Sequence, residues 1–231
     1  MPKVKLKSFL PHKTLSSKFW NKDETIKEDM RTALLEIADE FLTYLKVIVD
    51  VSDITFTGSY ANYNYTPYSD VDLHIVIEFA DVANNEELVK GFMAAKKEYW
   101  NNKYDITLKN VDVELYPQDQ QEPHYSSGVF SLQNNAWINK PQKFLKNPDI
   151  TAVRKKVNML KKEIDDVIDS ENIDDVRRVI EKIKKMRKAG LEKSGEMSSE
   201  NITFKALRSD GSIQKLYDNK FKLFSDSLSI K

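Results

Sequence analysis

The sequence contains no cysteine and only three histidines among its 231 residues. Disulfide bonds, thiolate metal sites and cysteine nucleophiles are therefore excluded, and a zinc site is disfavoured. A surplus of either charge is also missing, because 36 basic side chains balance 36 acidic ones. A passive nucleic-acid coat would carry a positive excess, so any site for a polyanion has to be local.

Long hydrophobic runs are absent as well. No run approaches the roughly 20 apolar residues that span a bilayer, and residues 1–10 lack the apolar core of a signal peptide. We therefore expect a cytoplasmic protein with no membrane partner. The hydrophobic content of 40% is enough for one large domain or for a compact pair of domains.

Prolines mark the middle of the chain. Regular helical periodicity resumes only after Pro141 and Pro148, which indicates a boundary in this region. We predict one domain over residues 1–145, including an N-terminal helix, and a helical lobe over residues 146–231.

Hydrophobic spacings of three and four residues predict the helices. The first runs from about residue 26 to residue 45 and the second covers residues 86–100. In the lobe, the same spacing predicts helices over residues 153–167, 173–186 and 213–224.

Runs of β-branched and aromatic residues predict the strands, which cover residues 53–57, 71–79, 111–116 and 129–132. A further run at residues 104–108 is separated from residue 111 only by Lys109 and Asn110, which suggests a hairpin. The expected fold class is α+β. A mixed β-sheet is flanked by the first two helices and followed by the helical lobe, with a cleft between the sheet and the lobe.

Two pairs of carboxylates lie at strand positions. Side chains alternate along a strand, so Asp70 and Asp72 project from one face while the intervening apolar residues pack on the other. Asp112 and Glu114 repeat this arrangement on a later strand. If the two strands are neighbours, at least three carboxylates converge, and hard oxygen ligands of this kind suit Mg²⁺ beside substrate phosphates.

A Gly-Ser pair precedes the first carboxylates. Gly58 allows a close approach of the backbone, and Ser59, at the start of a helical turn, offers its hydroxyl and adjacent N–H groups to a phosphate. The sequence therefore predicts a phosphate-binding turn together with a set of metal-binding carboxylates.

Together these motifs resemble the nucleotidyltransferase superfamily that includes DNA polymerase β. The segment from Gly58-Ser59-Tyr60-Ala61 to Ser69-Asp70-Val71-Asp72-Leu73 is similar to the branch with CCA-adding enzymes, oligoadenylate synthetases and bacterial cyclic-oligonucleotide synthases. With Val113-Glu114-Leu115-Tyr116, it also resembles small nucleotidyltransferases of tailed phages and bacteria. If a phage encodes the protein, its location is the host cytoplasm.

The resemblance implies a polymerase β-like core and transfer of a nucleoside monophosphate from an NTP to a hydroxyl, with pyrophosphate release. Asp70, Asp72 and a third carboxylate would bind Mg²⁺ or Mn²⁺, while Gly58 and Ser59 would bind the nucleotide. Counted back from Pro117, Glu114 matches the oligoadenylate synthetase branch and Asp112 the polymerase β branch. We favour Glu114, with Asp112 second. The acceptor stays open between an RNA end, another nucleotide, a protein and a small molecule.

Two alternatives remain from other functional classes. One is a non-catalytic nucleotide-binding or interaction module of the same fold, and the other is a toxin-like transferase that attaches AMP to a protein or tRNA. The loop from residue 60 to residue 68 departs from many relatives, because it carries four tyrosines that either stack on a base or pack the loop itself. His74 shares the face of the carboxylates on a regular strand, whereas His12 and His124 have no evident partner in the sequence.

Overall fold

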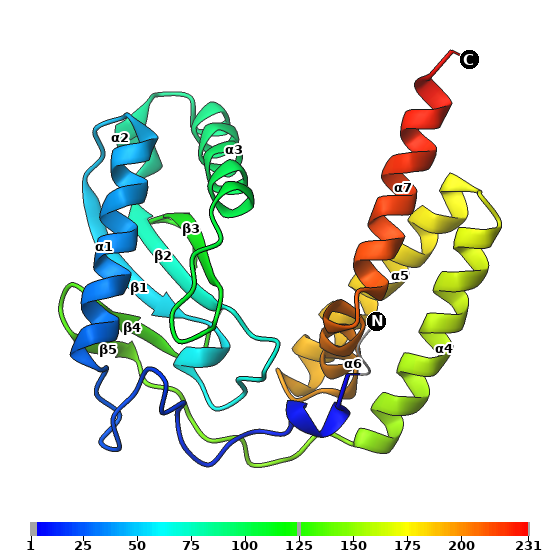
Figure 1. The fold of residues 1–231 in the computed structure, drawn as a ribbon, viewed down its shortest axis with the longest axis horizontal. Coiled ribbons are helices and arrows are strands. Elements are labelled where there is room, and N and C mark those ends of the chain that lie inside the picture. The colour runs from blue at the N-terminus through cyan, green and yellow to red at the C-terminus, as the bar shows by residue number, and fades with distance from the viewer. Residues whose placement is uncertain (1–3, 124–125, 231) are drawn as a thin grey trace. The chain divides into compact units, whose positions relative to one another are not determined.

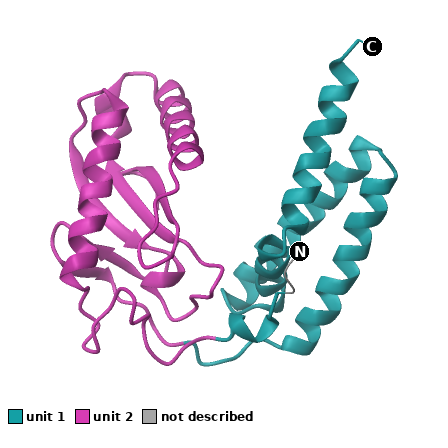
Figure 2. Cartoon of the chain, in the orientation of Figure 1, with its two compact units in different colours: residues 1–10, 144–231 teal, residues 11–143 magenta. Residues whose placement is uncertain are grey.

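The computed structural model describes residues 4–123 and 126–230. The chain divides into two compact units, the sheet unit of residues 11–143 and the helical unit of residues 1–10 and 144–231 (Figure 2). The sequence-based division fell at 145/146 and assigned the first ten residues to the other part. They group with the helices because Phe9, at the end of a short 3₁₀ helix (η1, Leu6–Phe9), is buried in the core of that unit.

A five-stranded sheet forms the centre of the sheet unit, in the order β3-β2-β1-β4-β5 (Figure 1). The strands are β1 (Val51–Thr57), β2 (Val71–Ile77), β3 (Val113–Asp119), β4 (Val129–Ser131) and β5 (Ala136–Asn139). Only β2 and β3 pair in parallel, and the other neighbours are antiparallel. The mixed sheet is confirmed. The strand at the end of the order, β5, was not predicted, because its few residues are mostly exposed and carry little hydrophobic signal.

Helices α1 (Glu28–Leu45) and α3 (Glu86–Lys103) flank the sheet as predicted. They lie side by side, since the ring of Phe41 on α1 contacts that of Trp100 on α3 edge to face, with centroids 5.4 Å apart. The Asn101 side chain donates to the Leu115 carbonyl and accepts from the Leu115 N–H. It thereby satisfies the N–H and carbonyl of Leu115 on β3, a strand at the edge of the sheet. A short helix, α2 (Phe79–Val82), takes the place of the end of the strand predicted over 71–79.

The predicted hairpin is correct at its turn and wrong in its first strand. Lys109 and Asn110 both have positive φ, as a two-residue hairpin turn requires, and Leu108 and Val111 exchange backbone hydrogen bonds. Residues 104–108 form no regular strand and pair with the following run through a bridge from Thr107 to Asp112 and a hydrogen bond from the Val113 N–H to the Ile106 carbonyl, while β3 itself pairs in parallel with β2.

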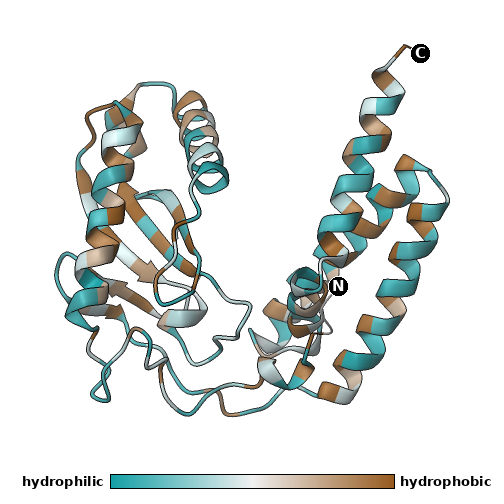
Figure 3. Cartoon of the chain, in the orientation of Figure 1, coloured by the Kyte–Doolittle hydropathy of each residue, from teal (hydrophilic) through white to brown (hydrophobic). Residues whose placement is uncertain are grey.

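The helical unit consists of α4 (Ile150–Asp169), α5 (Ile173–Ser194), α6 (Ser199–Ser209) and α7 (Ser212–Leu228). Hydrophobic and hydrophilic positions alternate along α4 and α5 (Figure 3), and the apolar ones meet in one core. Asp149, Asn172 and Ser198 cap α4, α5 and α6 by accepting N–H groups of the first turn. The short helix α6 was not predicted. In the described part of the chain, no helix is both long and apolar enough to cross a membrane.

Candidate active site

The sequence pattern of β2 directs its carboxylates to one side of the sheet. Val71, Leu73, Ile75 and Ile77 are fully buried on one face, whereas Asp72 and His74 alternate with them and stay partly exposed. Asp70 immediately precedes the strand and shares their side by alternation. The prediction for the two faces of this strand is confirmed.

The register of the sheet brings Asp72 opposite a second carboxylate. Its Cα partner on the parallel strand β3 is Glu114, and its partner on β1 is Thr57. Adjacent strands are about 4.8 Å apart, so paired residues project side by side on the same face. Asp112 lies just before β3, where its carbonyl accepts from the Val71 N–H at 2.8 Å. Both candidates for the third carboxylate therefore lie next to the start of β2.

The position of the Asp72 carboxylate requires a glycine at residue 58. A Cβ built on Gly58 would lie 1.5 Å from Asp72 Oδ2 and 2.5 Å from Asp72 Cγ. The φ of Gly58 is +74° and its ψ −158°, a region that side chains rarely enter. Its N–H donates to Ser126 Oγ at 3.2 Å. The absence of a side chain at Gly58 thus leaves room for the Asp72 carboxylate.

Ser59 begins a single 3₁₀ turn, η2 (Ser59–Ala61), as expected of a serine at the start of a helical turn. Its carbonyl accepts from the Asn62 N–H at 3.2 Å. The chain therefore turns sharply just after Gly58, the residue against which the Asp72 carboxylate lies.

Most of the tyrosine-rich loop packs within the protein. Tyr60 and Tyr63 are buried, and Tyr65 stacks on His12 with ring centroids 3.8 Å apart. Burial raises the pKa of Tyr60, and burial followed by a hydrogen bond to Glu24 raises the pKa of Tyr63 to about 12. Of the four tyrosines, only Tyr68 is exposed. His12, which had no evident partner in the sequence, also contacts the Tyr65 carbonyl at 3.0 Å, while His124 lies outside the described residues.

A groove of about 460 Å³ adjoins the start of β2 and β3. Its lining includes Tyr68, Asp70, Asp112 and Glu114, together with Asn101 from α3. The structure thus brings three of the four predicted carboxylates to one groove. Its lining contains no lysine or arginine among the described residues.

No group of three or more histidine, aspartate or glutamate side chains in residues 4–123 and 126–230 lies close enough together to hold a metal ion. The backbone positions favour convergence of the carboxylates, and their like charges oppose it. The donor set nevertheless fits a hard divalent cation, because Asp72 and Glu114 are register partners and both offer carboxylate oxygens.

A hydrogen-bonded chain on the same face was not predicted from the sequence. His74 Nδ1 pairs with Gln118 Oε1 at 2.8 Å, and Gln118 Nε2 donates to the Glu122 carbonyl at 2.9 Å. The Tyr116 hydroxyl donates to the carboxylate of Glu122 at 3.3 Å. Burial, and then the charge of Glu122, raise the pKa of Tyr116. The alternation of Glu114, Tyr116 and Gln118 in the sequence could have indicated that these side chains share one face of a strand.

The basic residues of α5 mostly form ion pairs. Arg177 and Arg178 each pair with the aspartate three residues before, and Lys182 pairs with Glu163 of α4 at 2.7 Å. This part of the helix is a charged, solvated face.

The fold is α+β, as predicted, and this face of the mixed sheet carries carboxylates at the start of two parallel strands. Residues 36–136 match the family model described as nucleotidyltransferase domain. This part of the chain, which includes all four carboxylates and Gly58, therefore belongs to the nucleotidyltransferase superfamily. Searches among curated proteins and solved structures gave no significant match. The family supports transfer of a nucleoside monophosphate as the general reaction.

Proposed function

We propose that residues 11–143 carry a metal-dependent nucleotidyltransferase that moves a nucleoside monophosphate from an NTP to a hydroxyl acceptor. The observation that supports this proposal best is the fit of Gly58 against the carboxylate of Asp72, whose register partner is Glu114. A partly exposed carboxylate on a sheet face, lying against a glycine in a backbone conformation that other residues rarely adopt, supports a site more than a loop cap.

Asp70, Asp72 and Glu114 would hold Mg²⁺ or Mn²⁺. When bound, such ions neutralise the charge of the triphosphate and lower the pKa of the acceptor hydroxyl. Ser59, at the start of its short turn, would offer its hydroxyl and neighbouring N–H groups to the phosphates. The carboxylate of Glu114, or in second place Asp112, would accept the proton of the acceptor hydroxyl.

In the reaction, the acceptor oxygen forms a bond to the α-phosphorus of the NTP. The bond from this phosphorus to the oxygen that bridges it to the β-phosphorus breaks, and pyrophosphate leaves with the electron pair of that bond. The chain contributes mainly position and charge, which is how most phosphoryl-transfer sites work.

The test is to incubate the protein with each labelled NTP, with Mg²⁺ or Mn²⁺, and with total cellular RNA and protein. We expect pyrophosphate release and transfer of label to one acceptor class, both lost in Asp72→Asn. The matched control Asp81→Asn changes an exposed aspartate of α2 and should keep full activity. Absence of pyrophosphate release with all four NTPs and both metals would refute the proposal.

A further inference from the structure

A second cavity lies in the sheet unit, at the opposite end of β3 from Glu114. Its volume is about 410 Å³, within the usual range for small-molecule sites. Asp119 lines it, five residues along the strand from Glu114, which is roughly 16 Å at ~3.3 Å per residue. The lining of this cavity shares no residue with that of the groove beside Asp70 and Glu114, so the two are separate, although Tyr116 and Glu122 of the hydrogen-bonded chain line the second cavity.

The floor of this cavity is apolar. Phe79, Met93 and Pro117 line it, and all three side chains are buried. They come from α2, α3 and β3, so the floor is built from three packed elements of one unit. Such a surface binds the apolar body of a ligand by removing it from water.

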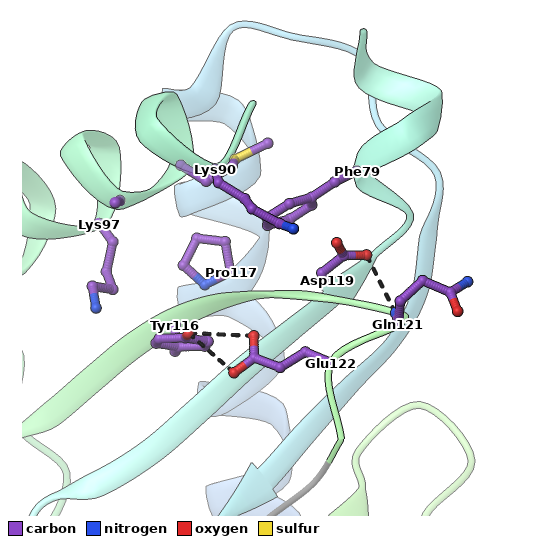
Figure 4. A pocket seen from close by; sticks show the side chains of 10 residues that line it. Phe79, Lys90, Lys97, Tyr116, Pro117, Asp119, Gln121 and Glu122 are labelled. Carbon is purple, nitrogen blue, oxygen red and sulfur yellow. Dashed lines mark hydrogen bonds between the residues drawn. The ribbon is translucent and has the colours of Figure 1, made fainter. Parts of the chain in front are cut away.

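A buried carboxylate stands beside this floor. Asp119 is 7% exposed, and in the described part of the chain the one hydrogen bond to its side chain comes from the Gln121 N–H, at 3.2 Å (Figure 4). None of the described lysines or arginines comes within ion-pair distance of it. A buried carboxylate is costly without a cationic partner, so a ligand ammonium group would find a favourable position here.

Two lysine side chains line other parts of the same cavity. Figure 4 shows Lys90 extending from α3 past Phe79, and Lys97 beside Tyr116. Lys97 Nζ lies 4.6 Å from the centroid of the Tyr116 ring, and among the described residues it forms no ion pair. Lys90 pairs with Glu86 at 3.6 Å, with both side chains largely exposed, so this pair is weak. Lys97 is thus available to an acidic group of a ligand.

We propose that this cavity binds a small zwitterion of the α-amino-acid kind with an apolar side chain. Its ammonium group pairs with Asp119, its carboxylate faces Lys97, and its side chain covers Phe79 and Met93. A polyanion does not suit the cavity, because Asp119 and Glu122 line it together with Lys90 and Lys97 and leave no surplus of positive charge. The inference is independent of the proposed nucleotidyl transfer.

The test uses the methyl resonance of Met93 in full-length protein labelled with ¹³C-methyl methionine. This side chain is 2% exposed on the cavity floor, and Met93→Leu assigns its signal. The probes are L-phenylalanine, L-leucine and L-methionine, each titrated alone to 10 mM. We expect a saturable shift of the Met93 signal with at least one probe. Three comparison compounds should bind at least tenfold more weakly. Glycine lacks the side chain, the N-acetylated probe lacks the positive charge, and the probe amide lacks the negative charge.

Variants separate the two charged anchors. Asp119→Asn can still accept from the Gln121 N–H, so the fold should persist while binding weakens at least tenfold. Lys97→Ala should also weaken binding. The matched controls are Asp81→Asn and Lys96→Ala, which lie nearby but do not line the cavity. Asp72→Ala should bind as the wild type does, which distinguishes this site from the candidate active site.

Three results would overturn the proposal. One is no shift with any probe up to 10 mM. Another is equal binding of a probe and its N-acetylated form. The third is unchanged binding in Asp119→Asn, which would assign the shift to another part of the molecule.

Discussion

Replacing Gly58 with alanine tests the relation between the glycine and the carboxylate of Asp72. The new Cβ meets Asp72 Oδ2 at 1.5 Å, Cγ at 2.5 Å and Cβ at 3.0 Å. The Asp72 side chain must therefore move, and an off-rotamer side chain costs about 0.5–1.5 kcal/mol. The backbone conformation itself costs a non-glycine residue about 1–3 kcal/mol. Both effects lower the free energy of unfolding.

Gly195 offers a matched control for the backbone effect. Its φ of +70° and ψ of −161° almost repeat the +74° and −158° of Gly58, but a Cβ there meets nothing within 4 Å. Gly195→Ala therefore carries the conformational cost alone. We expect Gly58→Ala to be more destabilising by about 0.5–1.5 kcal/mol, the cost of moving Asp72. Gly91→Ala, in the open middle of α3, should stabilise by about 0.5–1 kcal/mol.

Unfolding in urea can be followed by far-UV circular dichroism for all three variants. The three tryptophans at positions 20, 100 and 137 all lie in the sheet unit, so their fluorescence assigns the transition affected by Gly58→Ala. Nucleotidyl transfer should also fall at least tenfold in Gly58→Ala and stay unchanged in Gly195→Ala. Equal destabilisation by these two variants, together with full activity of Gly58→Ala, would refute the reasoning.

The remaining predictions concern charge. Asp72→Ala should abolish pyrophosphate release, because loss of a metal ligand removes several kcal/mol of charge stabilisation. The melting temperature should stay the same or rise, because repulsion between carboxylates is relieved. Full turnover in this variant would contradict the assignment. Glu114→Gln should lower the transfer rate much more than Asp112→Asn, and the reverse order in single-turnover assays would assign the proton acceptor to Asp112. Hydrogen bonds from Lys140 and then from a tyrosine hydroxyl lower the pKa of Glu24 below its ordinary value of 4.5. Its contribution to stability is therefore present above pH 4.5 and is lost as the pH falls through the lower folded-state pKa. Unfolding followed by tryptophan fluorescence should show this loss, and Glu24→Gln should reduce the pH dependence.

The sequence alone determined the local features of this protein. The alternation from Asp70 to Ile77 set which side chains face the core, because side-chain direction in a strand has a period of two residues. The turn at Lys109 and Asn110 followed from its two-residue length. The spacing of Gly58, Ser59 and the carboxylates was enough to indicate the superfamily.

Tertiary structure decided what depends on partners distant in the sequence. The register between strands places Glu114 beside Asp72 and brings the Asp72 carboxylate against Gly58. Local sequence patterns do not encode this register. Tyr60 and Tyr63 proved to pack the loop because residues far along the chain cover them. The cavity at Asp119 was not evident from the sequence, because its walls come from three elements that meet only in the folded unit.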